Sequence, residues 1–241
     1  MNTMKSNGHA TGSQWHTILT GELLLLGMLG KLLYTYPDQD LWTTISDDDL
    51  FAEVPFAEEQ TAVRQGLAHL QTWSRAQKER TPNESLSELQ ADYTRLFVGP
   101  GKVLAPLWES VYYGEERLTF QEETLDVRRW YQRFGLELVN LYHEPDDHIG
   151  LELAFLAHLA GKALAALEAG DQAGFHSFLQ AQKQFLTGHP LRWVFDWCAL
   201  VEEQCRTDFY RGIALLTRGA LLELRDQVLV DLPIDTIGVT A

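Results

Sequence analysis

The feature that most constrains the fold is the segment 148–169, a nearly continuous run of Leu, Ala and Phe. A helix that is apolar on every side is stable only where other elements bury it from several directions. A second dense apolar run, 23–33, lies inside a helical pattern that extends from Trp15 to Tyr34. The chain is therefore expected to fold around these two buried helices.

Helical patterns also dominate the rest of the chain. In 58–79 apolar residues recur every three or four positions, and Ser85 with Glu88 forms a capping box before a helix that should end near Gly99. Only 111–113 and 136–140 resemble strands. We predict an all-α chain, with a disordered tail at 1–13 and a single helical domain at 14–241. Further helices are expected after a cap at 47–49 and at 122–134, 171–186, 190–205 and 207–229.

Net charge excludes two classes of partner. The 241 residues include 19 Lys and Arg against 34 Asp and Glu, which gives a formal charge of −15. Such a field repels nucleic acid and anionic membranes, and it speeds the encounter with a basic peptide. The run 23–33 is interpreted as a buried helix. It is not an export signal, because Glu22 abuts it and no small-residue cleavage site follows, and it is too short to span a membrane, with Lys31 inside it.

The two cysteines are expected to be free thiols. Cys198 and Cys205 lie seven positions apart in a predicted helix. At a rise of about 1.5 Å per residue their backbones are about 10 Å apart, which is beyond the reach of a disulfide. Reduced core thiols are typical of a cytoplasmic protein.

Two stretches depart from the helical pattern. The first, ADYTRLFVGPGKVLAPLWESVYYG at 91–114, combines aromatic residues and prolines with little charge. It is too apolar for a solvated loop and too broken for a core helix. The second, YHEPDDHIG at 142–150, gathers acids and histidines. In this stretch Pro145, Asp146 and Asp147 are expected to form the start of the helix that follows.

Spacing alone allows two interpretations of the acid and histidine cluster. In the first, the carboxylates cap a helix and a histidine packs at its first turn. In the second, the cluster is a metal site of a hydrolase, built from His143, Asp147, His148 and Glu152. No second His, Asp or Glu cluster offers further ligands, and no nucleophile or dinucleotide signature is present. The sequence therefore predicts no catalytic residue, no metal and no cofactor.

The two stretches together resemble a known signature. YTRLFVGPGKVLAPLWESVY at 93–112, followed by EPDDHIGLEL at 144–153, is similar to the paired motifs of the TorD/DmsD family, the cytoplasmic maturation chaperones of molybdenum-containing oxidoreductases. The resemblance covers roughly residues 15–230, and the first motif is most similar to the DmsD branch. Two positions depart from the pattern: Leu107 replaces a second proline, and Gln121 replaces a glycine after Phe120.

The resemblance implies a non-catalytic helical chaperone. Such a protein binds the twin-arginine signal peptide of a molybdoenzyme of the DMSO reductase type until cofactor insertion and folding are complete. A leader with two arginines and an apolar segment requires a carboxylate and an apolar groove, which Asp147 and the proline-stiffened loop would supply. The implied signal-peptide-binding residues are Tyr93, Leu96, Phe97, Pro106, Trp108, Tyr112, Pro145, Asp147 and His148.

The same resemblance implies a set of partners. They are the twin-arginine leader and catalytic subunit of the client, proteins of molybdenum cofactor biosynthesis, and the twin-arginine translocase. Pro145 lies in a short hinge-like segment, 142–150, that would let helical halves exchange between protomers, so we expect a monomer with some domain-swapped dimer. The metal-dependent hydrolase is the alternative function.

Overall fold

The computed structural model describes residues 11–47, 50–113, 122–137 and 144–230. Within these ranges the chain forms nine α-helices and two shorter helical turns, and its one β feature is an isolated bridge between Trp108 and His148. The predicted all-α class is confirmed. The helices are α1 (Gly12–Tyr34), α2 (Gln39–Asp47), α3 (Thr61–Gln77), α4 (Pro82–Tyr93), α5 (Glu122–Arg133), α6 (Ile149–Glu168), α7 (Gln172–Gly188), α8 (Pro190–Gln204) and α9 (Asp208–Val230), and the turns are η1 (Thr94–Val98) and η2 (Glu109–Tyr112).

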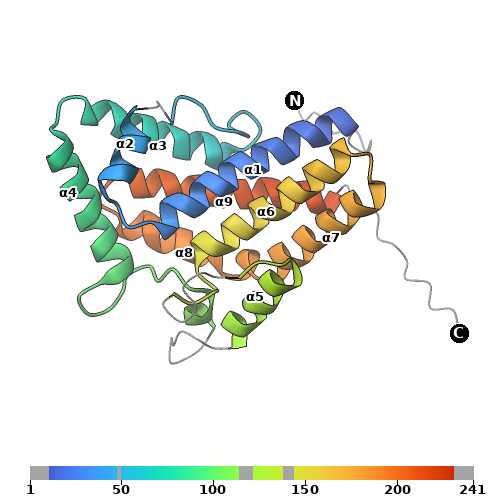
Figure 1. The fold of residues 1–241 in the computed structure, drawn as a ribbon. Coiled ribbons are helices and arrows are strands. Elements are labelled where there is room, and N and C mark those ends of the chain that lie inside the picture. The colour runs from blue at the N-terminus through green and yellow to red at the C-terminus, as the bar shows by residue number, and fades with distance from the viewer. Residues whose placement is uncertain (1–10, 48–49, 114–121, 138–143, 231–241) are drawn as a thin grey trace, which may run out of the picture.

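The two apolar runs form the central helix pair. Helices α1 and α6 lie side by side, with α9 behind them (Figure 1). Both are long and apolar enough to cross a membrane by length and composition alone. In this structure they pack leucines such as Leu26 and Leu29 of α1 and Leu153 and Leu156 of α6 into the core, whereas Leu24 of α1 is 60% exposed.

A second close pair joins distant parts of the chain. Helix α3 packs along α9. The backbones approach so closely that a Cβ atom on Gly66 would lie 2.7 Å from the carbonyl oxygen of Gly212, and one on Gly212 would lie 2.8 Å from that of Gly66. Only glycine fits at these positions, since real Cβ atoms do not come so near to backbone oxygen.

The structure corrects three predicted helix ends. Helix α4 begins one turn earlier than predicted, because Thr81 and Glu84 form the capping box and Pro82 occupies the first turn. The short helix α2 ends at Asp47 and does not begin there; Asp38 caps it by accepting a hydrogen bond from Leu41 N at 2.8 Å.

The third correction concerns α6. Its N-cap is His148, whose side chain accepts from Gly150 N, and the two preceding aspartates do not cap it. Asp146 and Asp147 instead bond to neighbouring elements, as described below.

Some of the remaining predictions concern residues that the structure describes, and others concern residues outside the described ranges. Cys198 and Cys205 are buried free thiols, as predicted. Helix α1 begins at Gly12 after its cap Thr11, slightly before the predicted domain start, and residues 1–10 lie outside the described ranges. Of the two strand candidates, 111–113 forms the end of the helical turn η2 and its C-cap Tyr113, whereas most of 136–140 is outside the described residues. Exchange of helical halves at 142–150 stays a prediction.

Glu22 is an acidic side chain buried between α1 and α7. Glu22 of α1 is only 2% exposed, and its Oε2 accepts a hydrogen bond from Gln182 Nε2 of α7 at 2.8 Å. Burial raises the pKa of Glu22 to about 8, an effect that the Gln182 hydrogen bond partly offsets. The folded chain therefore holds a proton here at pH values where the unfolded chain has released it.

Glu22→Gln should stabilise the fold increasingly as pH rises. Since the folded pKa lies above the unfolded one, the wild type loses stability as pH rises from about 4.5 through 8, by up to about 1.4 kcal/mol per pH unit from this group. Urea unfolding of both proteins at pH 5, 6.5 and 8 measures the difference. A stability difference that does not change with pH would show that Glu22 has an ordinary pKa.

Candidate peptide-binding site

Two backbone hydrogen bonds join the two signature segments. Ile149 N donates to Leu107 O at 2.8 Å, and Glu109 N donates to Asp147 O at 3.0 Å. Together they form the antiparallel bridge between Trp108 and His148. The bridge lies at the end of the bundle where α1 ends and α6 begins (Figure 1). The structure thus brings together motifs that are separate in the sequence.

The aspartates of the second motif face inward. Asp147 is fully buried; its Oδ2 accepts from Ser110 N at 2.8 Å, and its Oδ1 accepts from Thr124 Oγ1 at 2.7 Å. Asp146 forms a two-pronged ion pair with Arg128 of α5, with Nη2 to Oδ2 at 2.7 Å. Both aspartates therefore fasten this segment to η2 and α5, and Asp147 offers no free oxygen to a peptide.

His148 is a neutral packing residue at the start of α6. Its ring lies 5.3 Å from that of Tyr34 and 6.0 Å from that of Trp108, both in edge-on contact. Burial lowers the pKa of His148 to about 3, so the ring is uncharged at neutral pH. Gly150 permits the close approach of α1, because a Cβ there would lie 2.9 Å from Tyr34 Cβ.

Most residues of the first motif lie beneath the surface. Tyr93, Leu96 and Phe97 are at most 7% exposed, and Phe97 stacks on Trp197 at 6.2 Å. Ala105 N donates to Leu96 O at 2.9 Å, which closes the loop at its base. These three predicted binding residues therefore support the loop from inside the core and do not themselves reach the surface.

Only two of the predicted binding residues of the first motif, Trp108 and Tyr112, are partly accessible. Trp108 and Tyr112 are half-buried, whereas Pro106 and Pro145 are buried. The Tyr112 hydroxyl donates to Pro106 O at 2.8 Å, and its ring packs on Trp193 at 5.0 Å. Trp108 and Tyr112 are therefore held at the surface by a buried scaffold.

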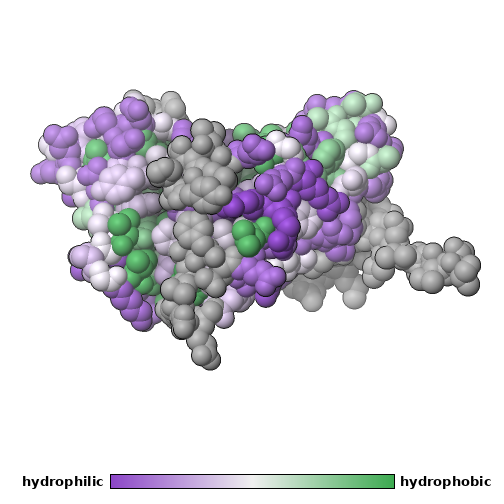
Figure 2. Space-filling model, turned by 60° about the horizontal axis from the view of Figure 1, so that its bottom comes forward, coloured by the Kyte–Doolittle hydropathy of each residue, from purple (hydrophilic) through white to green (hydrophobic). Residues whose placement is uncertain are grey.

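Apolar residues also appear on the surrounding face. Figure 2 shows apolar patches on this face, on either side of the residues drawn in grey. Of the exposed apolar side chains, Val98 at the end of η1 is 58% exposed and Leu125 of α5 is 49% exposed.

A cluster of buried acids underlies the site. Glu109 Oε2 lies 2.8 Å from His189 Nδ1, and Glu152 Oε2 accepts from Trp193 Nε1 at 3.2 Å. Burial, followed by the charges of Glu109 and Asp147, raises the pKa of Glu152 well above its ordinary value. These effects favour the protonated form of Glu152, and the cluster connects η2 with α6 and α8.

This arrangement separates the residues of the proposed metal site. Glu152 points toward Trp193 inside the core, whereas His148 packs against Tyr34 and Trp108. His143 lies outside the described residues. Within the part of the chain that the structure describes, no group of three or more His, Cys, Asp or Glu side chains could hold a metal ion.

Three residues at the site were not predicted. Tyr34 and Tyr36, at the end of α1 and just beyond it, are 44% and 47% exposed, and Tyr36 packs edge-on against Tyr93 at 5.3 Å. Glu144 is half-buried, and its Oε1 accepts from Trp108 Nε1 at 2.6 Å. The sequence signal for the tyrosines was two aromatics directly after an apolar helix.

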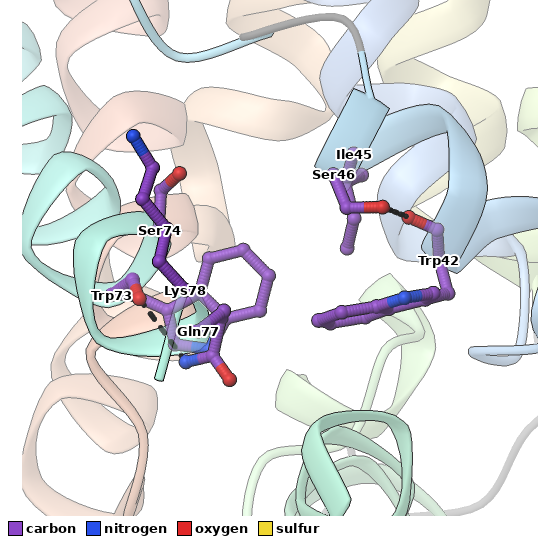
Figure 3. Close-up of a pocket in the computed structure, with 7 residues that line it drawn as sticks. All are labelled: Trp42, Ile45, Ser46, Trp73, Ser74, Gln77 and Lys78. Atoms are coloured by element: carbon purple, nitrogen blue, oxygen red, sulfur yellow. Dashed lines mark hydrogen bonds between the residues drawn. The ribbon is translucent and has the colours of Figure 1, made fainter. Parts of the chain in front are cut away.

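A separate pocket of about 170 Å³ lies between α2 and α3. Figure 3 shows Trp42 and Ile45 projecting from α2 toward Trp73 and Gln77 of α3. None of the signature residues lines this pocket. It is therefore a separate feature from the site at the end of α1.

Comparison with known proteins identifies the family. The model of the family described as nitrate reductase delta subunit matches residues 57–199, more than half of the chain. The chain belongs to this family. Among its relatives in the DmsD/TorD group, the Tat proofreading chaperone DmsD of Salmonella paratyphi A is 26% identical over 84% of this chain and 88% of its own length.

Two further known proteins are similar to this chain. The probable Tat proofreading chaperone DmsD of Haemophilus influenzae is 29% identical over 58% of this chain, and the match spans 62% of that protein. A crystal structure of a redox enzyme maturation protein from Archaeoglobus fulgidus aligns with a TM-score of 0.42 at 21% identity, covering 93% of this chain and 96% of that one.

Membership of the delta subunit family confirms the resemblance found in the sequence. The chain therefore belongs to the chaperone family that includes the DmsD and TorD proteins. This family is one of chaperones, which are not catalytic. The metal-dependent hydrolase is therefore wrong as an alternative function.

Asp147→Ala should destabilise the fold, whereas Asp147→Asn should be tolerated. Alanine leaves Ser110 N and Thr124 Oγ1 without their buried acceptor, and each unpaired group costs about 1–3 kcal/mol. Asparagine keeps an oxygen toward Ser110 N, and its amide nitrogen is able to donate to the Thr124 hydroxyl. Urea unfolding measures both variants, and equal stabilities would contradict the buried role.

Proposed function

We propose that this chain binds the twin-arginine leader of a molybdoenzyme of the DMSO reductase type. It holds the leader until cofactor insertion and folding are complete, and then releases the client to the twin-arginine translocase. Trp108 and Tyr112 contact the leader directly, while Tyr93, Leu96, Phe97, Pro106, Pro145, Asp147 and His148 hold that surface in place.

The observation that carries the proposal is the position of Trp108. It is a large half-buried aromatic residue, fixed by the backbone bridge to His148 and by its hydrogen bond to Glu144. Rigid aromatic side chains with little remaining freedom are the usual anchors of peptide interfaces, since little entropy is lost on binding. An apolar leader segment would pack there beside an acidic group.

The charge of the chain supports the same ligand. A formal charge of −15 favours encounter with a basic peptide, and a twin-arginine leader is basic before its apolar segment. The catalytic subunit of the client and the proteins of molybdenum cofactor biosynthesis are the further partners proposed.

The test compares a client with and without its leader. The tagged chain is used to capture proteins from anaerobically grown cells of its source, and mass spectrometry identifies what is bound. We expect a molybdenum-containing oxidoreductase that carries a twin-arginine leader, and we expect deletion of the leader to abolish its capture. Unchanged capture after deletion would instead indicate a scaffold that contacts only the folded client.

Trp108→Ala should mainly hasten release of the leader. Truncating a central aromatic anchor costs about 2 kcal/mol, which corresponds to a roughly thirty-fold faster dissociation. Added salt should slow association instead, since it screens the acidic field over about 10 Å at 0.1 M. Association and dissociation rates on immobilised leader peptide, measured across a salt series, separate the two effects.

Leu24→Ala is the matched control for Trp108→Ala. Leu24 is an exposed apolar residue of α1, about 15 Å along the helix from Tyr34 at 1.5 Å per residue, so this change also removes apolar surface but leaves the Trp108 contacts intact. We expect wild-type rates for Leu24→Ala. Equal rates for all three folded proteins would show that Trp108 does not contact the leader.

A further inference from the structure

We infer that Glu144 is the residue that binds a leader arginine, with Tyr34 and Trp108 enclosing the guanidinium. This inference rests on the proposed function and identifies the part of the site that distinguishes arginine from other cations. It replaces the role that the sequence suggested for Asp147.

The first step is the difference between the two acids. Both oxygens of Asp147 accept hydrogen bonds inside the fold, and the residue is fully buried. Glu144 is half-buried, and only its Oε1 accepts a bond from the described residues, from Trp108 Nε1 at 2.6 Å. Oε2 is therefore the carboxylate oxygen of this motif that remains available to a ligand.

The second step is that Glu144, unlike two buried acids of the chain, has no cationic partner among the described residues. The buried acids Asp92 and Asp146 are each paired with an arginine of the chain, at 3.0 and 2.7 Å. Glu144 forms no ion pair with any of the described residues, although burial raises its pKa above the ordinary value. The charged form of a half-buried carboxylate that has only a neutral donor, as Glu144 has in Trp108, is unfavourable unless a cation arrives with the ligand.

The third step is the aromatic surroundings. The rings of Tyr34 and Trp108 each make an edge-on contact with the His148 ring, and Tyr34 remains 44% exposed. The carboxylate also lies close to the phenols: after the larger effect of burial, its charge raises the pKa of Tyr34, and it helps to raise that of Tyr93 to about 12. Aromatic faces beside a carboxylate suit a planar guanidinium, which stacks and forms hydrogen bonds at once.

The inference predicts a preference for arginine over lysine. A lysine ammonium is a compact, strongly hydrated charge, and it lacks the planar fork that pairs with a carboxylate while stacking on a ring. The probes are therefore two synthetic peptides with the same apolar segment, one with consecutive arginines and one with lysines in their place.

Calorimetry with both peptides tests the inference on the full chain. Glu144→Gln should weaken binding of the arginine peptide about ten- to a hundred-fold and remove most of the preference over the lysine peptide. Tyr34→Leu should weaken it by about three- to ten-fold while leaving the carboxylate in place.

Glu168→Gln is the control, because Glu168 is an exposed acid at the other end of α6, about 30 Å away at 1.5 Å per residue. It should bind as the wild type does. Wild-type binding and preference in both folded Glu144→Gln and Tyr34→Leu would overturn the inference and leave the proposed function standing. Failure of the wild type to bind the arginine peptide would overturn the proposed function and the inference with it.

Discussion

The site depends on the antiparallel bridge between Trp108 and His148. Its two backbone hydrogen bonds hold the loop that follows α4 against the segment that begins α6. Backbone bonds of this kind do not depend on side-chain identity, so the bridge fixes the register of both segments at once. Trp108 then reaches the surface at a defined place, and His148 becomes both the cap of α6 and the support for Tyr34.

Buried acids reinforce the bridge from below. Asp147, Glu109 and Glu152 lie together beneath the surface, in a setting where unpaired charge is costly. Donors from the backbone and Thr124 satisfy both oxygens of Asp147, Trp193 donates to Glu152, and Glu109 pairs with His189. Because these bonds join four elements, the network holds the partly accessible residues Trp108 and Tyr112 in place. Polar interactions of this kind favour one arrangement of the core over its alternatives.

The sequence predicted the helices well and the orientation of charged side chains poorly. Apolar periodicity placed every long helix, since periodicity is a direct consequence of burial on one face. The capping box was misplaced by one turn because Thr81 with Glu84 and Ser85 with Glu88 fit the same pattern, and Pro82 decides between them. Whether Asp147 faces a ligand or the core depends on Ser110 and Thr124, which only the tertiary fold brings near.

The pairing of α3 with α9 has a consequence for how the chain is made. More than half of the sequence separates the end of α3 from the start of α9, the last helix described. At a synthesis rate of about 5–20 residues per second, α3 leaves the ribosome on the order of ten seconds before its partner exists. During that interval its apolar residues, among them Leu70 and Trp73, lack the surface that finally covers them. A nascent chain of this protein is therefore itself vulnerable to aggregation until its final helix has emerged.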